Sequence, residues 1–165
     1  IINLSLFEDN NRRFYLNGCS IILDILKTNL VDEEITSWAL MAVQNFATNR
    51  DNRIRLGEFD GCELVITAMN IHTNHIPSME FGCMALEKLA LDSNNNKKIG
   101  IANGCELILN ILQMHLNNDM VCELAWKACH RIAKNNDDHI LRFGKNNIAN
   151  LICQTINKHN QIEEV

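Results

Sequence analysis

The sequence predicts an all-α fold, a solenoid of three-helix repeats with a period of 43 residues. Three observations predict it. The triplets Asn17-Gly18-Cys19, Asp60-Gly61-Cys62 and Asn103-Gly104-Cys105 recur at a constant spacing of 43. Apolar residues follow each triplet at helical spacing. The 165-residue chain is 47% hydrophobic but only 5% aromatic, with one proline, which suits aliphatic cores between helices.

Apolar residues recur in register after the triplets. The expected second helices share two series, Ile22, Val65, Ile108 and Leu151, then Leu23, Ile66, Leu109 and Ile152. The expected third helices share three more, Ala42, Ala85 and Ala128, then Ala47, Ala90 and Ala133, then Phe46, Leu89 and Ile132. A further series four residues before the first alanines is expected to join the buried stripe: Trp38, Phe81 and Leu124.

Polar turns divide each unit into three helices, expected in the second unit at about 52–58, 61–71 and 77–91. Pro77 falls at a plausible first turn. The recurring glycine before the second helix fits a sharp change of direction, through positive φ or close packing. We expect a single domain over 1–165, divided into a partial unit 1–8, units at about 9–50, 51–93 and 94–136, and a partial unit 137–165. Because the chain opens inside a helical pattern, we expect a piece of a longer protein.

The unit resembles the armadillo repeat. Asn45-Phe46-Ala47, followed by Asn49 and Asp51-Asn52-Arg53, is similar to an armadillo third helix that runs into the next first helix. Leu89-Ala90 and Ile132-Ala133 carry weaker versions. The resemblance implies a right-handed α-solenoid with a concave face lined by third helices. A HEAT array with two helices per unit, or an irregular bundle containing a duplication, is the alternative.

The resemblance also implies where a partner binds. In nuclear-import adaptors of this family, a tryptophan and an asparagine on each third helix grip an extended peptide. The tryptophan-like places here hold Met41, Met84 and Lys127, and only Asn45 remains of the asparagines, so a receptor of that kind is disfavoured. The expected concave-face contacts for another protein partner are Met41, Asn45, Met84, Lys88, Lys127, Arg131 and Lys134.

The net charge and the cysteine content narrow the class of protein to which this chain can belong. A formal net charge of −5 disfavours general nucleic-acid binding, although the last unit of the concave stripe is locally basic. The sequence contains no run of eighteen or more apolar residues, so it predicts no membrane span. Seven cysteines among apolar neighbours favour reduced, buried thiols and a cytoplasmic or nuclear location.

No pattern in the sequence favours catalysis. His72 and His115 occupy one repeated place at the ends of second helices, where cations meet exposed carbonyls favourably, and no spacing predicts a metal or cofactor site. Lys97-Lys98 is interpreted as an exposed helix start. We therefore expect a non-enzymatic protein-binding scaffold. The alternative is a structural oligomerisation or regulatory segment of a larger multidomain signalling protein, including a homodimer through exposed repeat ends.

Overall fold

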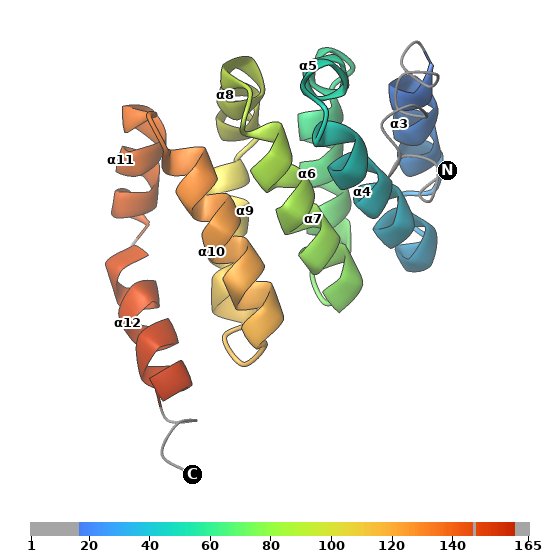
Figure 1. Cartoon of the computed structure of the whole chain (residues 1–165). Helices are drawn as coiled ribbons and strands as arrows, with labels where there is room; N and C mark the ends of the chain where they lie inside the picture. Colours follow the sequence, from blue (N-terminus) through green and yellow to red (C-terminus); the bar gives the residue numbers. More distant parts are fainter. Residues whose placement is uncertain (1–16, 147, 161–165) are drawn as a thin grey trace.

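The computed structural model describes residues 17–146 and 148–160, and this part of the chain contains ten α-helices and no strand (Figure 1). The predicted all-α class is therefore confirmed. The helices are α3 (Gly18–Thr28), α4 (Glu33–Ala47), α5 (Arg50–Glu58), α6 (Gly61–Ile71), α7 (Ile76–Leu89), α8 (Ser93–Ile101), α9 (Gly104–Met114), α10 (Asp119–Ala133), α11 (Asp137–Lys145) and α12 (Ile148–Asn160). The partial unit expected at 1–8 lies outside the described residues.

The longer helices α4, α7 and α10 lie side by side, with α7 between the other two (Figure 1). Helix α6 contacts both α3 and α9, and α5 contacts α8, so these helices pack on their counterparts in the neighbouring units. None of the described helices is long and apolar enough to cross a membrane.

One continuous apolar core runs between these helices. In α4 and α7, Leu40, Val43, Cys83 and Leu86 are fully enclosed, and the predicted small residues lie between helices, as Ala85 does. Small side chains let the helix axes approach closely, so their recurrence reflects packing. The core contains the predicted second-helix series as well, apart from Ile152.

The prediction that Trp38, Phe81 and Leu124 form a buried stripe is wrong for Trp38. Trp38 is 54% exposed, while Phe81 and Leu124 are partly buried against the core. Its spacing from Ala42 fits the core, but Trp38 also lies three and seven residues before Met41 and Asn45. That spacing places it on the stripe of α4 that points away from the core.

The helix limits follow their caps. Helix α6 covers the predicted 61–71, whereas α5 begins at Arg50 because the Asn49 side chain accepts hydrogen bonds from the N–H groups of Asp51 and Asn52. Helix α7 runs over Ile76–Leu89 in place of 77–91 and carries Pro77 in its first turn.

The turn before the second helix separates the two roles expected of its glycine. Positive φ falls on the preceding residues, Asp60 at 57° and Asn103 at 63°, and on none of the described glycines. At Gly61 an added Cβ would lie 2.6 Å from the Leu56 carbonyl oxygen. Glycine is required here because the backbones approach closely, and aspartate and asparagine provide the left-handed turn.

Candidate functional site

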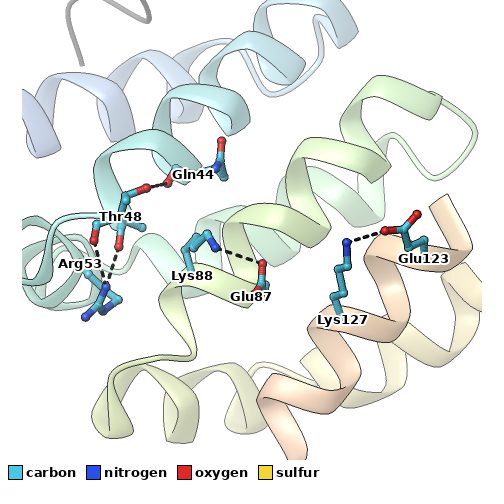
Figure 2. A network of polar contacts seen from close by, with 8 residues as sticks. Gln44, Thr48, Arg53, Glu87, Lys88, Glu123 and Lys127 are labelled. Carbon is cyan, nitrogen blue, oxygen red and sulfur yellow. Dashed lines mark hydrogen bonds and ion pairs between the residues drawn. The ribbon is translucent and has the colours of Figure 1, made fainter. Parts of the chain in front are cut away.

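The seven expected contact residues lie along the row formed by α4, α7 and α10. Met41 and Asn45 are on α4, Met84 and Lys88 on α7, Lys127 and Arg131 on α10, and Lys134 at the C-cap of α10. Lys127 and Lys134 are exposed and the other five are half-buried. Because these three helices are adjacent, the structure brings the residues to one surface, called here the third-helix face. Figure 2 shows two of them, Lys88 and Lys127.

Trp38 belongs to the same face, although the sequence pattern assigned it to the core. It continues the exposed stripe of α4 toward the N-terminus of that helix, and Phe81 and Leu124 occupy the matching places on α7 and α10. Tryptophan is one of the side chains enriched at the energetic centres of protein interfaces. Its separation from Met41 and Asn45, three and seven residues, is consistent with this position, but its separation of four from Ala42 fits the core equally well.

Two of the lysines on this face are already paired. Lys127 Nζ donates to Glu123 Oε1 at 2.5 Å, and Lys88 Nζ lies 3.4 Å from Glu87 Oε2 (Figure 2). The hydrogen bond to Glu123 raises the pKa of Lys127. The positive charge expected along α10 is therefore offset at Lys127, whereas no acidic side chain among the described residues pairs with Arg131 or Lys134.

The C-terminal end of α4 is closed by an arginine from the next helix. Arg53 Nη1 donates to the carbonyl oxygen of Ala47 at 2.9 Å and more weakly to that of Thr48 at 3.4 Å (Figure 2). These acceptors are among the last carbonyls of α4, which lack partners within the helix. Burial lowers the pKa of Arg53, and neighbouring Asp92 opposes that effect.

The matching junction one unit later is open. Asn96 stands 43 residues after Arg53, and its shorter side chain donates from Nδ2 to the Ile132 carbonyl at 3.2 Å. A cavity of about 260 Å³ lies here, between the end of α7, the first half of α8 and the end of α10. It is lined by Ala90, Leu91, Ser93, Asn96, Lys97, Arg131, Lys134, Asn135 and Asn136. We call it the basic pocket; the sequence alone did not connect Lys97 with α10.

The two repeated histidines join successive units. Nε2 of His72 lies 2.7 Å from the Leu30 carbonyl oxygen, and Nε2 of His115 lies 2.7 Å from that of Thr73. Both residues are C-caps, of α6 and α9, as their predicted place at helix ends requires. Their acceptors, however, lie in the loop of the preceding unit. Their repetition is accounted for by a contact between units.

Polar side chains also connect successive first helices. Asn95 Nδ2 donates to the Arg53 carbonyl oxygen at 2.8 Å, and Lys98 Nζ donates to that of Gly57 at 2.6 Å. One unit later, Arg142 Nη1 donates to the Gly100 carbonyl oxygen. Lys98 of the expected exposed pair is thus a half-buried link between units, while Lys97 is exposed.

The thiols are arranged for packing. Six of the seven cysteines are buried and Cys153 is exposed. Burial raises the pKa of Cys62, Cys83 and Cys129 to about 12, which keeps them as thiols, whereas the nucleophile in cysteine chemistry is the thiolate. Within the described residues, no three histidine, cysteine or acidic side chains come together as metal ligands.

Comparison with known proteins adds no relative: the chain matches no protein-family model, and no curated protein or solved structure shows significant similarity to it.

Proposed function

We propose that this chain is a non-catalytic interaction scaffold that holds a partner peptide or domain against the third-helix face. The observation that carries the proposal is the placement of Trp38, Met41, Met84 and Arg131 on three adjacent helices, where Trp38 is exposed and the other three are half-buried. Exposed or half-exposed tryptophan, methionine and arginine are the residue types enriched at protein interfaces.

The architecture that supports this proposal is a right-handed, armadillo-like solenoid of three-helix units with a period of 43. In its favour, α3, α6 and α9 begin at Gly18, Gly61 and Gly104, and equivalent histidines make equivalent bonds to the preceding unit. In such an array each unit contacts only its neighbours, and the third helices line an extended concave surface. An extended partner segment fits a surface of that shape.

The face offers different chemistry along its length. At the α4 end, Trp38 and Met41 provide apolar area, and methionine adapts its shape to varied partners. At the α10 end, Arg131 and Lys134 provide positive charge, with no acidic partner in the described structure. A segment with an apolar part followed by an acidic part complements this order, and the charge would set its direction along the face.

Peptide selection on the immobilised chain tests the proposal, with the methionine methyl resonances as a map. Selected peptides should shift the methyl signals of Met41 and Met84 and leave those of Met69 and Met79, which are fully buried, unchanged. Trp38→Ala and the double variant Lys127→Glu/Arg131→Glu should each weaken binding about tenfold or more while helix content stays constant. Binding unaffected by both variants would assign the partner to another surface.

A second candidate function, self-association, is favoured by the surface of α11 and α12. Ile152 is 40% exposed, whereas its counterparts Leu109 and Ile66 are 6% and 3% exposed between units. Leu141 on α11 and Ile156, four residues after Ile152 on α12, are exposed as well. We expect Ile152→Asp to abolish any dimer seen by light scattering. A monomer at high concentration would remove this candidate and leave the scaffold proposal standing.

A further inference from the structure

We propose that the basic pocket receives the phosphate group of a phosphorylated serine or threonine in the partner segment. This inference rests on the proposed function and specifies the chemistry of one end of the third-helix face. Arg131 and Lys134 belong to that face, while Lys97 reaches the same cavity from α8.

The charge of the pocket is unbalanced. Lys97, Arg131 and Lys134 line it, and no aspartate or glutamate does. The other cations near this face are offset, Lys88 by Glu87 and Lys127 by Glu123. Three cations around one cavity match a phosphomonoester, which carries about −1.5 to −2 charges at pH 7, better than a single carboxylate.

The cationic side chains of the pocket do not donate hydrogen bonds to the carbonyl groups at the end of α7. At the preceding junction Arg53 donates to the last carbonyls of α4, and no equivalent bond is found for Arg131 at the end of α7. The buried Nε–H of Arg131 has no hydrogen-bond acceptor. The Nε–H of Arg53 is unpartnered as well, so the difference lies in the terminal guanidinium nitrogens. Those of Arg131 have no acceptor among the described residues and lie beside two lysines, where they can donate to phosphate oxygens.

A buried acceptor in the pocket calls for a hydrogen-bond donor beside the phosphate group. Asn96 lines the pocket, is 7% exposed, and donates through Nδ2 to Ile132, yet its Oδ1 accepts no hydrogen bond. A phosphomonoester dianion carries no donor of its own, so a backbone N–H beside the phosphorylated residue would supply the donor that Oδ1 lacks.

The size of the cavity agrees with one side-chain group. Its volume of about 260 Å³ is below the roughly 300–1,000 Å³ typical of sites for drug-sized ligands. At the preceding junction Arg53 extends over the end of α4, whereas the shorter Asn96 at the equivalent place leaves space beside the end of α7.

The test uses the full chain and three degenerate peptide libraries with a fixed central phosphoserine, glutamate or serine. Fluorescence anisotropy should show the phosphoserine library binding at least about tenfold more tightly than the other two, the size expected for charge-assisted hydrogen bonds. The Arg131 Nε–H and Asn96 side-chain amide resonances should shift on binding. Arg131→Gln and Lys134→Gln should each remove most of the preference for phosphoserine.

The matched control is Lys145→Gln, which removes the same charge from an exposed residue at the end of α11, outside the pocket. It should retain the phosphoserine preference. An equal loss in this control would reduce the effect to general electrostatics and overturn the proposal. Equal binding of the serine library would overturn it too, while leaving the scaffold function intact. If none of the libraries binds and inorganic phosphate alone produces the same resonance shifts, the pocket is a site for free phosphate and the proposal of a phosphorylated peptide is wrong.

Discussion

The contact between successive first helices predicts opposite effects for one substitution at two equivalent glycines. Gly100 and Gly144 are each the eighth residue of a first helix, α8 and α11, although 44 residues separate them in place of the 43 of the repeat. At Gly100 an added Cβ would overlap the ring of His139, which is 4% exposed and has Nδ1 3.1 Å from the Ile132 carbonyl oxygen. At Gly144 an added Cβ would meet nothing within 4 Å.

Opposing contributions decide whether each substitution raises or lowers the free energy of unfolding. Replacing a helical glycine by alanine stabilises by up to about 1 kcal/mol. Moving His139 costs about 0.5–1.5 kcal/mol for its hydrogen bond and about 1–3 kcal/mol for the overpacked core. Gly100→Ala should therefore lower the free energy of unfolding by about 1–3 kcal/mol, whereas Gly144→Ala should leave it unchanged or raise it by up to about 1 kcal/mol.

Urea unfolding followed by circular dichroism measures both variants. At this chain length 1 kcal/mol corresponds to about 2–4 °C in Tm, so thermal melts provide a second readout. In a His139→Ala background the ring is gone, and Gly100→Ala should no longer destabilise. A Gly100→Ala variant as stable as the unmodified protein would refute the reasoning, because it would show that the His139 ring turns aside without cost.

Three further predictions concern burial and the links between units. Burial raises the pKa of the Cys83 thiol from the ordinary 9.0 to about 12. The contribution of this thiol to stability is therefore complete below about pH 9 and is lost as the pH rises toward 12. The difference between the urea midpoints at pH 8 and 10.5 should be smaller in Cys83→Ala than in the unmodified chain. Acrylamide should quench the fluorescence of Trp38, which is 54% exposed, more strongly than that of the half-buried Trp126. The emission of the Trp38→Phe variant should therefore be quenched less than that of the unmodified protein, and equal quenching of the two would show that Trp38 is buried. His115→Ala should lower the free energy of unfolding by about 1 kcal/mol, and an unchanged urea midpoint would show that its contact with Thr73 contributes nothing.

The second helices could be predicted closely because their signals are local. A left-handed residue, a glycine in close backbone contact and an apolar stripe mark the start of α6 and α9. The third-helix face was harder to define. Trp38 stands four residues before Ala42 and three before Met41, so periodicity alone fits either side of the helix, and only the packing of α4 against α7 settles which side is covered.

The basic pocket lay beyond sequence reasoning for a different reason. Lys97 and Arg131 are 34 residues apart and do not share a repeated place, so a search for equivalent positions separates them. What brings them together is the stacking of α8 against the ends of α7 and α10. The one local signal was the change from Arg53 to Asn96, a long cation replaced by a short amide at a helix junction.

Packing and recognition leave different marks on a chain that repeats itself. Where helices meet, the equivalent places described above stay apolar, and Ala42, Ala85 and Ala128 keep one residue type because close packing between the helices limits the volume there. On the third-helix face the same kind of series changes chemistry from unit to unit, from Met41 to Lys127 and from Asn45 to Arg131. Since these places share one backbone environment, folding tolerates each choice equally. The variation is therefore available to specify a partner, and Lys127→Met with Arg131→Asn should change what binds while leaving the free energy of unfolding within about 0.5 kcal/mol.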